Sequence, residues 1–219
     1  MRLLPLSRDG YGPCSAILTI SNASCEKHNN SRLGLRSQIS KPPPEPKWQS
    51  SRASNFIKSS CSTTKYPALC IQSLAAFAPS IQQSPRQLAQ TALSVSLDRA
   101  RATQAFVSKM KKFKGLKKRE YEAINDCSEE MNEGVDRLSK SVKELKHMGQ
   151  ANGQDFLWHI SNVETWVSAA LTDENTCFDG FAGKGLDGKV KASIRGRVIN
   201  VAQVTSNALS LVNQFASKQ

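Results

Sequence analysis

The residues of this chain best suited to chemistry are its cysteines, which form disulfide bridges, stay as free thiols or bind metal ions. The sequence contains six of them. Cys61 and Cys70 have eight residues between them, which suits a bridge that closes a short helical hairpin, although two buried free thiols remain an alternative. A zinc site is disfavoured because no histidine or second cysteine pair lies nearby at zinc-finger spacing. We therefore expect no metal and no cofactor.

Catalytic side chains follow no recognisable pattern. The three histidines, His28, His147 and His159, are scattered, and the sequence contains no G-x-S-x-G nucleophile elbow. Residues 183–188 fit the glycine spacing of dinucleotide-binding loops, but they follow a predicted helix, whereas that motif requires a preceding strand. These observations predict a protein that is not an enzyme.

Three carboxylates form the remaining chemical feature. At 100° per residue, Glu129, Glu133 and Asp136 lie on the helix face roughly opposite Met131 and Leu138. Such an acidic face can bind the cationic rim of a partner protein, or it can be an ordinary solvated surface. Both interpretations remain open on the residues alone.

A long helix must position these carboxylates and Cys127. Its apolar positions recur at alternating steps of three and four residues, and Ser128 is the one polar member of the series. The series comprises Tyr121, Ile124, Ser128, Met131, Val135, Leu138, Val142 and Leu145. This pattern predicts a helix over about residues 117–148, with one face in a core.

Similar patterns predict further helices. Short helices are expected at residues 55–60 and 66–77, and long ones at 85–113, 154–181 and 189–216. The apolar positions of the first long helix include Ala102, Phe106 and Phe113. Glycine-bearing connections between the long helices predict an all-α, up-down-up-down four-helix bundle preceded by a helical hairpin. In antiparallel neighbours, a bridge between Cys127 and Cys177 requires a stagger of the two helices.

Residues 1–54 differ from the rest of the chain. They are rich in Ser, Arg, Asn and Pro, and too few apolar residues recur to build a core, so we expect disorder there. No secretory signal is evident, because Pro5 and Arg8 interrupt the first apolar residues. No apolar run is long enough to cross a membrane. The net charge of +12 favours acidic partners or simply solubility.

Residues 55–219 resemble the plant invertase and pectin methylesterase inhibitor family in the spacing of several motifs. The motifs are Cys61-x8-Cys70 with Tyr66-Pro67, Asp126-Cys127-x-Glu129 before Val135-Asp136, Trp166 to Thr172 followed by Thr176-Cys177-x-Asp179, and Ser206 to Leu211. The resemblance implies a four-helix bundle with an N-terminal hairpin. It also implies two disulfide bridges, Cys61–Cys70 and Cys127–Cys177.

The resemblance further implies an extracellular protein of the plant cell wall that inhibits a carbohydrate-active enzyme by covering its cleft in a 1:1 complex. The contact residues implied by the matching motifs are Glu129, Glu133, Asp136, Thr176 and Asp179. Pectin methylesterase is the expected target and acid invertase the alternative, because residues 153–158 lack the Pro-Lys-Phe triplet common in invertase inhibitors. A bundle that binds in the wall without inhibiting either enzyme is a third hypothesis. The basic run 109–119 crowds one turn, which favours solvation or contact with acidic pectin over nucleic-acid binding.

Overall fold

A computed structural model describes residues 47–149, 152–182 and 188–218 of the chain. Every regular element within these ranges is helical. The elements are α1 (Lys47–Cys61), α2 (Pro67–Leu74), the short 3-10 helix η1 (Ala75–Phe77), α3 (Ala78–Ile81), α4 (Pro85–Met110), α5 (Lys118–His147), α6 (Gly153–Asp179) and α7 (Lys189–Ala216). The predicted all-α class is therefore confirmed.

The N-terminal helix is longer than the sequence predicts. It was expected to begin at Asn55, but α1 begins at Lys47 and buries Ala53 and Ile57 one helical turn apart. The sequence does not reveal the start of this helix, because few other apolar residues occur in its first turns to mark a helical period. Residues 1–46, with Cys14 and Cys25, and most of the glycine-bearing segment 183–188 lie outside the described residues. Because residues 47–54 lie in α1, the expected disorder is wrong there and stays a prediction only for residues 1–46. The domain boundary at residue 54 also stays a prediction.

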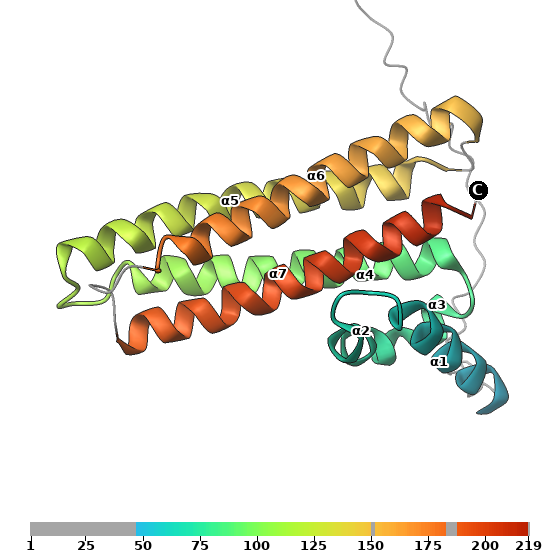
Figure 1. Cartoon of the computed structure of the whole chain (residues 1–219), viewed down its shortest axis with the longest axis horizontal. Helices are drawn as coiled ribbons and strands as arrows, with labels where there is room; N and C mark the ends of the chain where they lie inside the picture. Colours follow the sequence, from blue (N-terminus) through green and yellow to red (C-terminus); the bar gives the residue numbers. More distant parts are fainter. Residues whose placement is uncertain (1–46, 150–151, 183–187, 219) are drawn as a thin grey trace, which may run out of the picture. The chain divides into compact units, whose positions relative to one another are not determined.

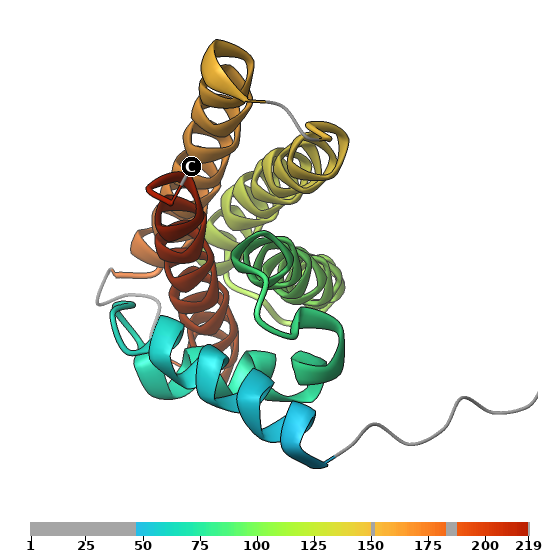
Figure 2. The same cartoon turned by 90° about the vertical axis from the view of Figure 1, so that its right-hand side faces the viewer.

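The four long helices form a bundle in which each packs against two neighbours. Helix α4 contacts α5 and α7, and α6 also contacts α5 and α7. Successive long helices run in alternating directions (Figure 1). The view along the bundle shows α1 and α2 beside α4 and α7 (Figure 2). The hairpin therefore leaves the outer surface of the α5/α6 pair uncovered.

Local signals set the ends of these helices. The Ser84 hydroxyl accepts a hydrogen bond from the Gln87 amide at 3.2 Å, and Pro85 occupies the first turn of α4. At the start of α5, the Glu120 side chain accepts a hydrogen bond from the Lys117 amide at 2.8 Å. Helix α5 is followed by Gly149, whose positive φ of 56° suits glycine.

The predicted apolar seam of α5 is largely confirmed. Most of its positions from Ile124 to Leu145 are buried, whereas Tyr121 is 50% exposed. Tyr121 lies in the first turn of α5, at the end of the bundle, where neighbouring helices no longer cover it. Two predicted core residues of the first long helix are also exposed: Ala102 faces outward, and Phe113 falls in the loop because α4 ends at Met110.

Both expected disulfide bridges are present. Cys61–Cys70 links α1 to α2, with Cα atoms 5.6 Å apart, and closes the N-terminal hairpin. Cys127–Cys177 links α5 to α6, with Cα atoms 4.2 Å apart. All four half-cystines are buried.

Polar contacts anchor the hairpin to the last helix. The Asn207 side chain on α7 accepts a hydrogen bond from the Tyr66 amide and donates one to the Tyr66 carbonyl, each at 3.0 Å. Gln214 donates to the Ser60 carbonyl at 3.2 Å and to the Thr63 hydroxyl at 2.9 Å. The backbone that leads into α2 is therefore held by side chains that come much later in the sequence.

Candidate functional site

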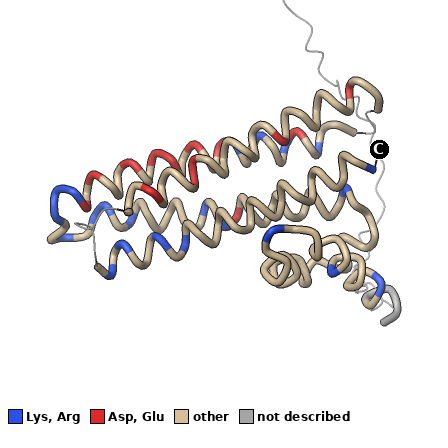
Figure 3. Tube along the Cα trace, in the orientation of Figure 1, with Lys and Arg blue, Asp and Glu red and all other residues tan. Residues whose placement is uncertain are grey.

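The exposed outer surface of α5 carries the carboxylates that the sequence singles out. We call Glu129, Glu133 and Asp136 the acidic face; all three are exposed. Acidic residues gather along the α5/α6 pair, away from the hairpin (Figure 3). Because the apolar residues of α5 point into the bundle, this face is free to meet another molecule.

Helix α6 contributes the other two predicted contact residues. Thr176 and Asp179 are exposed, and the Thr176 hydroxyl donates to the Thr172 carbonyl at 3.0 Å within the helix. The Cys127–Cys177 bridge brings Thr176 and Glu129 to nearly the same level, since Glu129 follows one half-cystine by two positions and Thr176 directly precedes the other. The structure shows no hydrogen bond between these α6 side chains and the acidic face within the described residues.

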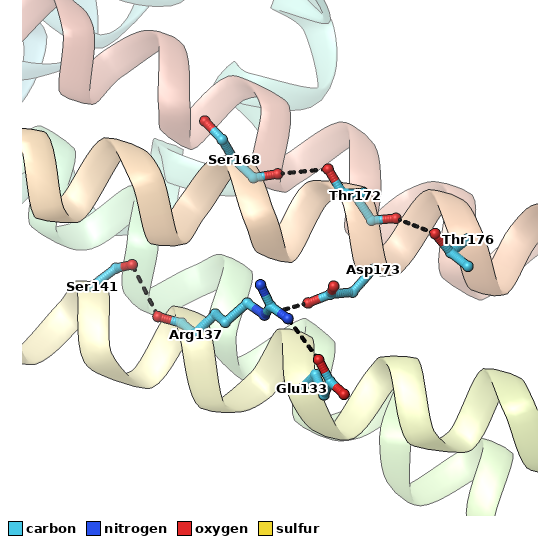
Figure 4. Close-up of polar contacts among 7 residues, drawn as sticks. All are labelled: Glu133, Arg137, Ser141, Ser168, Thr172, Asp173 and Thr176. Atoms are coloured by element: carbon cyan, nitrogen blue, oxygen red, sulfur yellow. Dashed lines mark hydrogen bonds and ion pairs between the residues drawn. The ribbon is translucent and has the colours of Figure 1, made fainter.

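Arg137 joins the acidic face to α6. Its Nη2 donates to Glu133 Oε2 at 2.6 Å, and its Nε lies 2.9 Å from Asp173 Oδ2 (Figure 4). The second contact is an ion pair without hydrogen-bond alignment, so that this Asp173 oxygen has no hydrogen-bond partner. The hydrogen bond that Arg137 donates to Glu133 raises the pKa of Arg137, which stays a cation. One guanidinium therefore orients two carboxylates from different helices.

Asp173 is unusual among the acidic residues because its side chain is only 8% exposed. Burial raises its pKa to about 6; the positive charge of Arg137 opposes this shift, and the negative charges of Glu130 and Glu133 add to it. The Asp173 side chain lies beside Gly134 of α5, where a β-carbon would come 3.7 Å from the Ala170 carbonyl oxygen. A β-carbon at that distance would make an ordinary van der Waals contact, so the place of the carboxylate does not depend on glycine.

Glu174, the next residue, is fully buried in the bundle. Its Oε1 accepts a hydrogen bond from the Thr205 hydroxyl of α7 at 2.9 Å, whereas Oε2 has no partner. Burial raises the pKa of Glu174 to about 8, against the smaller effect of the Thr205 hydrogen bond. The side chain is thus a protonated carboxyl group at neutral pH.

The site is a surface and not a cleft. Within the described residues, no group of three or more His, Cys, Asp or Glu side chains is placed to hold a metal ion. A surface pocket of 220 Å³ lies at the start of α6, and its lining residues include Phe156, Leu157 and Ala216 but no ionisable side chain. No helix among the described residues has the length and apolar character needed to span a bilayer. The exposed, charged side chains of α5 and α6 form a surface of the kind that can contact another macromolecule.

Comparison with known proteins decides the family. The family model described as "Plant invertase/pectin methylesterase inhibitor" matches residues 55–211, which is most of the chain. The chain belongs to this family. It is 59% identical to the 21 kDa protein of Daucus carota over 76% of this chain and 86% of that protein. It is 53% and 55% identical to pectinesterase inhibitors 11 and 9 of Arabidopsis thaliana, over 77% of this chain and 84% of each relative.

Solved structures show the same fold. A mutant form A of a pectin methylesterase inhibitor from Arabidopsis superposes with a TM-score of 0.57 and 20% identity, covering 70% of this chain and 92% of that one. Another pectin methylesterase inhibitor of Arabidopsis thaliana gives a TM-score of 0.51 and 21% identity, covering 74% and 96%. As a plant invertase/pectin methylesterase inhibitor family member, the protein is an enzyme inhibitor and not a catalyst, and its partner is an enzyme.

Sequence reasoning missed three side chains near the predicted contact: Arg137, which is partly exposed, and the buried acids Asp173 and Glu174. The signal for the buried acids was present, because Glu174 falls between Ala170 and Cys177 at steps of four and three residues. A carboxyl group at a core position of a helix indicates a buried, protonated or paired acid.

Proposed function

We propose that this family member inhibits a pectin methylesterase by covering its active-site cleft in a 1:1 complex. The acidic face of α5, with Thr176 and Asp179 of α6, makes the contact. The protein acts outside the cell, in the plant cell wall, where oxidising conditions maintain its two disulfide bridges.

The observation that carries this proposal is the exposure of all five contact residues on the helix pair that the hairpin leaves uncovered. The disulfide between α5 and α6 makes that pair rigid, and a pre-ordered surface loses little entropy on binding. Carboxylates on such a surface attract a partner with a cationic rim and speed the encounter.

The names of the relatives support methylesterase as the target. Two proteins more than half identical to this chain are named pectinesterase inhibitors. Residues 153–158 also lack the Pro-Lys-Phe triplet of the invertase inhibitors that this chain resembles. Acid invertase is the alternative target.

A paired inhibition assay tests the proposal. The purified full chain, with both disulfides formed, is titrated against a plant pectin methylesterase and a plant acid invertase from mildly acidic to neutral pH. We expect saturable inhibition of the methylesterase at a 1:1 ratio, no cleavage of the inhibitor, and no effect on the invertase. Unchanged methylesterase activity at micromolar excess contradicts the proposal, and inhibition of invertase alone establishes the alternative.

A further inference from the structure

One end of the bundle is strongly cationic, and the proposed inhibitor contact does not use it. We call this surface the cationic end. It comprises seven residues around the α4–α5 loop and four at the start of α7: Lys109, Lys111, Lys112, Lys114, Lys117, Lys118, Arg119, Lys189, Lys191, Arg195 and Arg197. No acidic residue occurs in the segment 109–119. Figure 3 shows the basic residues gathered where α4 leads into α5 and where α7 begins.

Packing brings the two basic segments to the same place. Met110, Leu116 and Val190 all pack against one buried cluster, so the end of α4, the α4–α5 loop and the start of α7 share this end of the bundle. Two arginines of α7 are held by aromatic rings: Arg197 lies 4.1 Å from the ring centre of Phe106 on α4, and Arg195 lies 4.3 Å from that of Phe178 on α6. Both arginines nonetheless stay exposed.

Among the described residues, the structure gives an ion pair for one of the seven cations around the α4–α5 loop. Lys118 pairs with Glu122 at 3.9 Å, and both side chains are largely exposed. For Lys112 and Lys114, which are exposed, the structure gives no acidic side chain within ion-pair distance among the described residues. Like charges that lie close together repel one another, and binding of a polyanion reduces that repulsion.

An aromatic ring stands among these lysines. Phe113 is 59% exposed and is flanked in sequence by Lys112 and Lys114. An apolar ring in such a position costs free energy in water and offers a flat surface on which a sugar ring can lie. Cations beside an exposed aromatic ring suit a carboxylated sugar better than a simple anion.

We propose that the cationic end binds de-esterified pectin, a linear polymer of carboxylated sugars, at the same time as the acidic face holds the enzyme. This inference rests on the proposed function, because a methylesterase converts neutral methyl esters of pectin into carboxylates. The inhibitor then concentrates where its target enzyme has already acted. Nucleic acid is the competing polyanion, but the cations here crowd a loop and a helix start and do not line a groove.

Binding of the full chain to polymers tests this inference. Immobilised polygalacturonate and highly methyl-esterified pectin of matched length are compared, with duplex DNA as the nucleic-acid probe, at about 0.15 M ionic strength. We expect binding to polygalacturonate that weakens steeply with salt, and at least about tenfold weaker binding to the esterified polymer.

Two matched triple variants locate the site. K111Q/K112Q/K114Q removes three charges from the cationic end, and K140Q/K143Q/K146Q removes three exposed charges elsewhere on α5. The first is expected to lose at least about tenfold in affinity for polygalacturonate, and the second less than about threefold. We expect Phe113→Ala to lower the affinity for polygalacturonate that remains at high salt. Far-UV circular dichroism verifies that each variant is folded.

Each remaining outcome decides the inference. Equal losses in the two triple variants, equal binding to the esterified polymer, or tighter binding to DNA than to polygalacturonate overturns it. Methylesterase inhibition is measured separately on a short, fully esterified substrate. Selective polymer binding without methylesterase inhibition supports this inference and refutes the proposed function. A K111Q/K112Q/K114Q variant that inhibits normally but no longer binds the polymer supports both.

Discussion

Arg137 of α5 and Asp173 of α6 form an ion pair across the interface between the two helices, with Arg137 Nε 2.9 Å from Asp173 Oδ2. The carboxylate is nearly buried, and the guanidinium, 35% exposed, also holds Glu133 on the outer surface. This pair therefore connects the interior of the α5/α6 interface to the acidic face.

Replacing Arg137 with Met should destabilise the protein in a pH-dependent way. The variant leaves a buried carboxylate without its cation, and we expect about 1–2 kcal/mol less unfolding free energy at pH 8, a loss limited by the partial exposure of the arginine. At pH 5 the loss should be smaller, because the Asp173 pKa of about 6 means that the group is mostly protonated. Urea unfolding at the two pH values measures the difference. The double variant R137M/D173N should regain most of the loss, and a double variant as unstable as R137M contradicts the role of the pair.

Replacing Glu174 with Gln should stabilise the protein increasingly as the pH rises from about 4.5 to about 8. A carboxyl group with a higher pKa in the folded protein than in the unfolded chain binds a proton on folding. Its favourable effect is complete below pH 4.5 and is lost as the pH rises through about 8. Gln keeps an acceptor for Thr205 without ionising. We expect equal stability of the two proteins at pH 4 and a gain on the order of 2 kcal/mol for Glu174→Gln at pH 9, measured by chemical unfolding. Parallel pH profiles of wild type and variant would show that Glu174 does not titrate in this range.

Reversing the charge of the acidic face should weaken inhibition without unfolding the bundle. E133K/D136K changes two exposed residues, and we expect a Kd for pectin methylesterase raised at least about 10- to 100-fold, mainly through a faster off-rate and a weaker salt dependence. The control D98K/E122K reverses two exposed acids outside the predicted contact and should change the Kd less than about threefold. If folded E133K/D136K inhibits as well as wild type, the acidic face does not take part in the complex.

The two disulfide bridges should contribute unequally to stability. Cys127 and Cys177 are separated by 50 residues and Cys61 and Cys70 by nine. In the chain-entropy account, the longer loop gives about 4 kcal/mol and the shorter about 2.7 kcal/mol. The variant C127A/C177A should therefore have the lower Tm in calorimetry, and C61A/C70A should retain a cooperative bundle. The reverse order of Tm values argues against this account.

Prediction from sequence succeeded where a local pattern is enough. Helical periodicity and glycine turns give the number and order of the long helices, because each needs one apolar face in the core. Two of the errors lie at the bundle end: Tyr121 has the right period but no neighbour to cover it, and Phe113 lies beyond the last turn of α4. Periodicity says which face of a helix is apolar but not where its neighbours stop.

The candidate site was predictable only in part. Exposure of Glu129, Glu133 and Asp136 follows from their phase relative to the seam. The ion pair of Arg137 with Asp173 depends on the stagger of α5 against α6, and the Glu174–Thr205 hydrogen bond depends on the packing of α6 on α7. Both distances are set by tertiary packing, which no spacing along a single helix encodes.

The attachment of Tyr66 to Asn207 has a consequence for the order in which the molecule is assembled. The two residues are 141 positions apart, so at 5–20 residues per second a ribosome needs roughly 7–28 s after synthesising Tyr66 to reach Asn207. During that interval the amide and carbonyl of Tyr66 face water, and the apolar side of the hairpin has no finished bundle to rest on. The hairpin can therefore complete its contacts only after the last helix has been synthesised.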